Sequence, residues 1–146
     1  MGSSQSKVSL KNTFLNLGYP EELFIEDLKL DFSYNSLKFE VTLPLIIKEK
    51  DQVYFLVDYK PQKNLHFFER GMLALARLFF SPLPYYAIIT NLEVFALIDL
   101  YEFKVIKNGK EVIPRYEDVK KHSPPPPKGF KEDLEKKILA IYLSGG

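Results

Sequence analysis

Asp58 and Lys60 are the residues of this chain whose types and spacing could do chemistry. They flank Tyr59 directly after the apolar run from Val53 to Val57. Residues two apart on a strand point to the same face of a sheet, so both side chains can enter one site. A carboxylate can hold Mg²⁺ against a phosphate, and a lysine can orient the attacking water. The pair therefore predicts a centre for metal-assisted phosphodiester hydrolysis, with Asp58 as a metal ligand.

Asp58 and Lys60 could equally form an ordinary surface ion pair. A metal centre would need further carboxylates from neighbouring strands. Glu26 and Glu40 precede the Asp58 segment in the chain, and either could reach the same cleft. The candidate catalytic residues are therefore Asp58, Lys60, Glu40 and Glu26. Mg²⁺ would be the cofactor of an active enzyme, whereas an inactive domain would need none.

Hydrophobic periodicity predicts the elements that must position this pair. Leu10, Phe14 and Leu17 recur at helical spacing before Gly18, which indicates a short helix over residues 8–17. An apolar stripe at helical spacing predicts a second helix over residues 65–80. Alternating or continuous apolar runs predict strands over residues 37–41, 43–47, 53–57, 85–90, 94–99 and 103–105, and residues 23–26 fit either a strand or a helical turn. This mixture predicts an α/β fold.

A proline run separates the last predicted helix from the rest of the chain. Residues 123–129 contain Pro124 to Pro127, and consecutive prolines adopt extended polyproline II, so we expect a stiff spacer here. A C-terminal amphipathic helix is predicted within residues 130–146. The apolar residues on its expected face are Phe130, Leu134, Ile138 and Ile141. This face would pack on the preceding domain, on a second copy as a homodimer, or on another protein partner.

Composition limits the classes of function. The 146 residues suit one domain over residues 1–122, followed by the spacer and the final helix. Because the chain has no cysteine and two histidines, disulfides and a structural zinc site are not expected. No stretch approaches the ~20 apolar residues of a membrane helix, and residues 1–20 lack the apolar core of a signal peptide. We therefore expect a cytoplasmic protein without a membrane partner.

The formal charge of +1 means that any affinity for DNA must come from a local patch. Residues 101–137 carry more basic than acidic side chains. A phosphate-contacting surface there would use Lys104, Lys107, Lys110, Arg115, Lys120 and Lys121. A solvated surface of mixed charge is the competing interpretation.

The order and spacing of several segments resemble a known family. The segments are Leu17-Gly18-Tyr19-Pro20, Phe55-Leu56-Val57-Asp58-Tyr59-Lys60 and Ala87-Ile88-Ile89-Thr90-Asn91. They resemble the N-terminal domain of type I restriction enzyme R subunits, a branch of the PD-(D/E)xK nucleases. The resemblance implies a restriction-endonuclease-like mixed β-sheet flanked by helices and, where the site is intact, a Mg²⁺-dependent DNA endonuclease.

Departures from the family pattern predict a degenerate active site. By spacing, the family's carboxylate on the strand before the hairpin falls on Leu45, which cannot ligate a metal. The Gln and Tyr that many members carry on the following helix fall on Gly71 and Leu75. We therefore expect a PD-(D/E)xK-like domain that binds nucleic acid or a protein partner without cutting. The alternatives are an active endonuclease with a migrated carboxylate and a structural subunit that self-associates.

Overall fold

The computed structural model describes residues 2–144, with side chains described from residue 5 onward. The helices are α1 (Gly2–Asn16), α2 (Glu69–Phe79), α3 (Tyr116–Val119) and α4 (Glu132–Leu143), with 3₁₀ turns at Glu21–Leu23, His66–Phe68 and Lys110–Val112. The strands are β1 (Phe24–Tyr34), β2 (Leu37–Glu49), β3 (Gln52–Tyr59), β4 (Tyr86–Thr90), β5 (Phe95–Asp99) and β6 (Lys104–Asn108). No helix in these described residues is long and apolar enough to cross a membrane.

The six strands form a mixed sheet in sequence order, from β1 to β6. β3 and β4 run parallel, and all other neighbouring strands are antiparallel. A parallel pair needs a crossover connection, and α2 supplies it between β3 and β4. The predicted α/β class is therefore confirmed, with a mixed sheet flanked by helices and a C-terminal helix.

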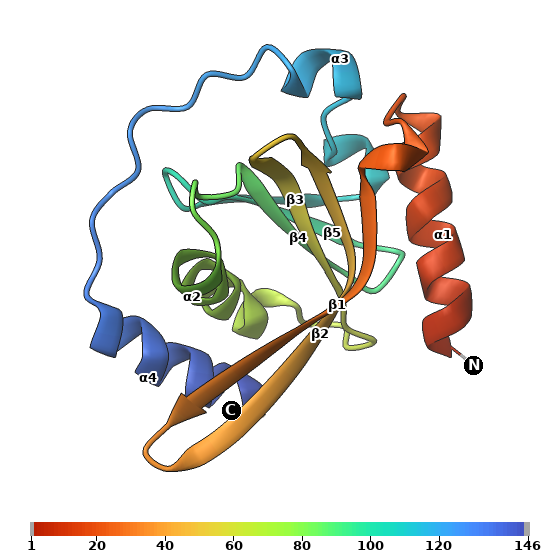
Figure 1. Ribbon diagram of the computed structural model, residues 1–146. Coiled ribbons are helices and arrows are strands. Elements are labelled where there is room, and N and C mark those ends of the chain that lie inside the picture. The colour runs from red at the N-terminus through yellow and green to blue at the C-terminus, as the bar shows by residue number, and fades with distance from the viewer. Residues whose placement is uncertain (1, 145–146) are drawn as a thin grey trace.

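Helices cover both faces of this sheet, as Figure 1 shows. α2 and α4 pack on one face around Leu56 and Ile89, and we call this the α2/α4 face. α1 and α3 pack on the other face around Phe55 and Val57, which we call the α1/α3 face. Because β3 is covered on both sides, its run from Val53 to Val57 is buried throughout.

The N-terminal helix begins earlier than predicted, since α1 extends from Gly2 to Asn16. Phe14 is buried and packs against the rings of Tyr19 and Phe55, at centroid distances of 5.4 and 5.2 Å. The chain then turns at Gly18, whose φ of +94° is a backbone conformation that glycine adopts without strain. The apolar spacing therefore located the packed end of the helix and missed its polar beginning.

β1 and the far part of β2 form a two-stranded ribbon that extends beyond the rest of the sheet (Figure 1). The sequence interpretation left residues 23–26 open and assigned no strand to residues 27–34. The chain forms a 3₁₀ turn and then β1, which pairs with β2 from Phe24–Ile47 to Tyr34–Leu37. β2 is continuous, so the two strands predicted over residues 37–41 and 43–47 are one.

Residues 122–131, which we call the proline strap, have no regular secondary structure and run from α3 around to α4 (Figure 1). α4 then packs on α2 in the same folded unit, with Leu139 and Ala140 in the core. The predicted apolar face of this helix was wrong in part: Ile138 packs against the core, whereas Leu134 and Ile141 are 50% and 49% exposed. The buried side instead carries Glu135 and Tyr142, whose polar contacts fix the rotation of the helix.

Candidate functional site

Asp58 and Lys60 meet at the end of β3, as their spacing predicted. Lys60 Nζ lies 3.5 Å from Asp58 Oδ2, and the Asp58 side chain is only 7% exposed. Burial raises the pKa of Asp58, although the positive charge of Lys60 opposes that effect. The Lys60 ammonium also lies 5.1 Å from the ring of Phe68 and 5.3 Å from that of Tyr142. Two aromatic rings thus lie beside the Lys60 ammonium and stabilise the cation.

Tyr142 of α4, which the sequence interpretation did not single out, occupies the space beside Asp58. Its hydroxyl donates a hydrogen bond to Asp58 Oδ2 at 3.0 Å and lies 3.4 Å from Met72 Sδ. Burial raises the pKa of Tyr142 well above its ordinary value, and the charge of Asp58 adds to that shift. The hydroxyl therefore remains a proton donor to Asp58 across the neutral pH range.

Gly71 on α2 makes room for the Tyr142 ring. A Cβ atom at this position would stand 2.3 Å from Tyr142 Cδ1 and 2.4 Å from its Cγ. Contacts this short require the ring to move, so a side chain at position 71 and the observed placement of Tyr142 exclude each other. Position 71 is where the family resemblance places a glutamine. The missing side chain at Gly71 is thus what allows the Tyr142 ring to reach Asp58.

A buried ion cluster holds α4 against α2. Both Glu135 oxygens accept hydrogen bonds from Arg70 at 2.8 Å, and Arg77 Nη1 donates to Oε2 at 3.0 Å. Glu135 is 1% exposed, and burial would raise its pKa, but the hydrogen bonds and charges of the two arginines outweigh burial and lower it. This carboxylate is therefore ionised and fixes α4 where Tyr142 reaches Asp58.

The structure does not bring Glu26 or Glu40 to Asp58. Glu26 lies opposite Leu45 on β2 and is neutralised by Lys11 Nζ at 2.9 Å. Glu40 is exposed on the β1–β2 ribbon, four residues along β2 from Pro44, which at ~3.3 Å per residue is roughly 13 Å away. The two carboxylates chosen from the sequence to complete a metal centre therefore lie elsewhere.

A different carboxylate, Asp27, lies near Asp58. Leu45 pairs with Val57, the residue before Asp58, and Asp27 and Pro44 fall between the pairs Glu26–Leu45 and Leu28–Leu43. Asp27 and Pro44 are therefore close to the end of β3. Asp27, Pro44 and Asp58 line one pocket of about 300 Å³, together with Ser6, Thr42 and Tyr59. Asp27 also has a φ of +54° and forms an ion pair with Lys7.

Leu45, the position to which sequence spacing assigned the lost carboxylate, does not face this pocket. It is fully buried on the α1/α3 face with Phe14, Phe55 and Val57. Pro44 is the β2 residue that faces the Asp58 side. Within residues 2–144, no group of three or more His, Cys, Asp or Glu side chains is placed to hold a metal.

The basic residues proposed to contact phosphates do not share one face. Lys107 pairs with Ala96 on the α2/α4 face, and its Nζ lies 2.7 Å from the buried Glu69 Oε2. Lys104, three residues earlier, projects from the opposite face of β6. Arg115 Nε lies 3.7 Å from Glu117 Oε1. Lys110, Lys120 and Lys121 belong to the segment around α3, which covers the α1/α3 face.

Comparisons with known proteins give no information about this site. No family model matches the chain, and no curated protein or solved structure matches it at a significant level. The resemblance to restriction enzyme R subunits therefore stays a prediction. The contacts of Asp58, Lys60 and Tyr142 carry the functional argument.

Proposed function

We propose that this chain is a restriction-endonuclease-like domain that binds a protein partner and does not cleave phosphodiester bonds. The observation that carries the proposal is the hydrogen bond from the Tyr142 hydroxyl to Asp58 Oδ2. Mg²⁺ requires near-octahedral oxygen ligation, and here the oxygen of a lone buried carboxylate already serves a tyrosine and a lysine. The order of antiparallel strands, α2 and a parallel strand supports the architecture.

The outer side of α4 favours a protein partner over DNA. Leu134, Ile141 and Phe67 are each about half exposed, and a shallow pocket of about 180 Å³ lies between Phe67, Ile138 and Ile141. Clustered exposed apolar side chains mark protein interfaces. Of the basic residues considered for phosphate contact, Lys107 lies apart on the α2/α4 face, where a buried glutamate neutralises it.

Two assays test this proposal. In the first, wild-type protein and the Asp58→Ala variant are incubated with supercoiled plasmid and either Mg²⁺ or Mn²⁺, and we expect no cleavage that depends on Asp58. In the second, DNA binding is measured at about 50 and 200 mM salt, and we expect no steep loss of affinity with salt. Asp58-dependent nicking, or tight binding that falls steeply with salt, would contradict the proposal. Sedimentation of wild type and Ile141→Glu shows whether a second copy is the partner.

A second candidate function is a Mg²⁺-dependent DNA endonuclease that needs α4 to move. The observation that favours it is that Asp27 and Asp58 line the same pocket. In that case Asp27 and Asp58 would hold the metal, and Lys60 would support the attacking water. A Tyr142→Ala variant would then cut plasmid DNA with Mg²⁺. Cutting that survives both Asp27→Asn and Asp58→Asn would exclude this site.

A further inference from the structure

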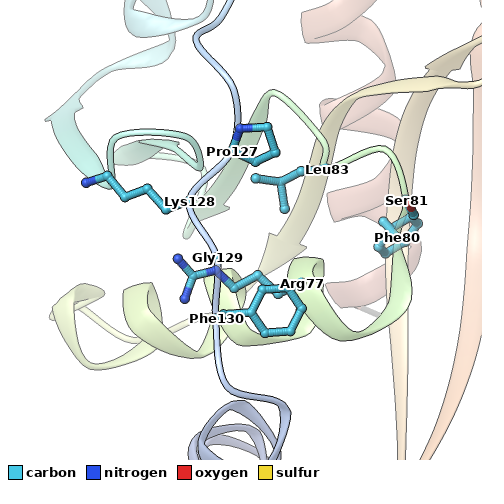
Figure 2. A pocket seen from close by; sticks show the side chains of 8 residues that line it. All are labelled: Arg77, Phe80, Ser81, Leu83, Pro127, Lys128, Gly129 and Phe130. Atoms are coloured by element: carbon cyan, nitrogen blue, oxygen red, sulfur yellow. The ribbon is translucent and has the colours of Figure 1, made fainter.

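Another cavity lies between the proline strap and the end of α2, and Asp58 does not line it (Figure 2). Its volume is about 520 Å³, within the ~300–1,000 Å³ typical of small-molecule sites. It is lined by Arg77, Phe80, Ser81, Leu83, Pro127, Lys128, Gly129 and Phe130. Figure 2 shows the Phe130 ring and the Arg77 side chain together where the strap crosses α2, with Leu83 and Pro127 on one side of them. The proposed function does not use this cavity.

The walls of the cavity suit a flat apolar group. Phe80, Leu83, Pro127 and Phe130 are its apolar lining residues, and Phe130 is 46% exposed although it is aromatic. One side of the Phe130 ring is near the Arg77 guanidinium, whose Cζ lies 5.4 Å from the ring centroid. Aromatic rings pair favourably with other rings in offset or edge-to-face arrangements. A planar ligand could therefore gain contact area on Phe130 that water does not provide.

The polar lining of the cavity is cationic. Arg77 and Lys128 contribute positive charge, and in the described part of the chain no acidic residue lines the cavity. Glu135 does not neutralise Arg77 fully, because Arg70 already donates to both of its oxygens. Arg77 gives Glu135 a single hydrogen bond, from Nη1, and a guanidinium has about five N–H groups. Two arginines sharing one carboxylate leave an excess positive charge beside the Phe130 ring.

We propose that this cavity binds a small aromatic anion. Its ring would lie against Phe130 and Leu83, and its carboxylate or phosphate would contact Arg77 and Lys128. An aromatic carboxylate and a nucleotide share this chemistry. The inference stands apart from the proposed function, since it uses neither Asp58 nor the outer side of α4.

The test is calorimetric titration of the full chain with two aromatic anions, naphthoate and AMP. Two controls are titrated in the same way: naphthalenemethanol, which has the ring without the charge, and inorganic phosphate, which has the charge without a ring. We expect at least one of the aromatic anions to bind more tightly than both controls. Binding of naphthoate alone identifies a carboxylate ligand, and binding of AMP alone identifies a nucleotide. If neither anion binds, or the uncharged ring binds equally well, the proposal is wrong.

Two matched charge reversals locate the site. Lys128→Glu should weaken binding of the anion roughly tenfold, as expected for losing one charge-assisted contact. Lys131→Glu makes the same change of charge three residues along the chain, at an exposed lysine that does not line the cavity, and should leave affinity within about twofold. Phe130→Ala should weaken binding without lowering the melting temperature. Equal effects of the two lysine variants, or ligand-induced amide shifts that spare Ser81 and Gly129, would overturn the assignment.

Discussion

The two faces of the sheet are held together by different chemistry. On the α1/α3 face, Phe14, Tyr19 and Phe55 form a ring cluster with centroid distances of 5.2 to 5.6 Å. On the α2/α4 face, the core also contains the buried acids Asp58 and Glu135. Apolar contacts tolerate small shifts, whereas buried charges need particular partners. We infer that packing on the α1/α3 face stabilises the fold, while the buried charges on the α2/α4 face determine the position of α4.

Removing a ring from the α1/α3 face should have the largest effect. Phe14→Ala leaves a cavity between Tyr19 and Phe55, and we expect it to lower the free energy of unfolding by about 3–5 kcal/mol. Urea denaturation followed by circular dichroism measures the change. Leu15→Ala, at an exposed neighbour on the same helix, is the control and should cost far less. A loss below about 1 kcal/mol for Phe14→Ala would show that this face does not secure the fold.

Breaking the ion cluster on the α2/α4 face should release α4 specifically. Glu135→Ala leaves Arg70 and Arg77 without their shared carboxylate, and we expect a loss of about 3 kcal/mol, at the low end for buried pairs because Arg70 reaches solvent. Amide hydrogen exchange should show faster exchange in α4 while β3 and β4 stay protected. Glu132→Ala, on the same helix at an exposed site, is the control. Unchanged exchange in α4 would contradict the assigned role of Glu135.

Adding one methyl group under Tyr142 tests the fit between α2 and α4. Gly71→Ala should cost about 1–3 kcal/mol, because its Cβ would overlap the Tyr142 ring. In a Tyr142→Gly background, which also removes the Tyr142 Cβ that would stand 2.7 Å away, the same change should instead stabilise the protein by up to about 1 kcal/mol, since alanine favours helix. Thermal unfolding of the four proteins gives this double-mutant cycle. The contact would be disproved if Gly71→Ala had the same effect in both backgrounds.

Asp58 and Glu135, two of the buried acids, should respond to pH in opposite directions. The pKa of Asp58 is raised by burial, so its contribution favours the fold at low pH and weakens as pH rises through that pKa. The pKa of Glu135 is lowered by its arginines despite burial, so its stabilisation is present near neutral pH and is lost on acidification. Relative to wild type, Asp58→Asn should therefore gain stability as pH rises from acid to neutral, and Glu135→Gln should lose it. Denaturation curves measured across that pH range show whether the stabilities of the two variants, relative to wild type, change in these opposite directions.

The sequence predicted secondary structure where the spacing of nearby apolar or glycine residues indicates it. The buried run of β3 and the glycine stop after α1 are of this kind. β1 also carried a usable signal, since Leu28, Leu30 and Phe32 alternate with charged residues, but its low apolar content concealed it. Residues 2–7 carry no such pattern, so the beginning of α1 could not be predicted.

The site was predictable only in part. Spacing along one strand brought Asp58 to Lys60, because that relation is local. The roles of Tyr142 and Gly71 depend on how α4 docks, and buried polar contacts with residues far away in the sequence set that docking. Hydrophobic spacing alone selected Leu134 and Ile141 as the packed face, since it cannot anticipate that a glutamate will be buried between two arginines.

We proposed that Tyr142, and not a metal ion, is the partner of the Asp58 carboxylate. A crystal structure of the protein soaked in Mn²⁺, with anomalous diffraction to locate the ion, tests this most directly. We expect no Mn²⁺ at Asp58 and the Tyr142 hydroxyl still within hydrogen-bonding distance of its carboxylate. A Mn²⁺ ion bound between Asp58 and Asp27, with Tyr142 displaced, would contradict it.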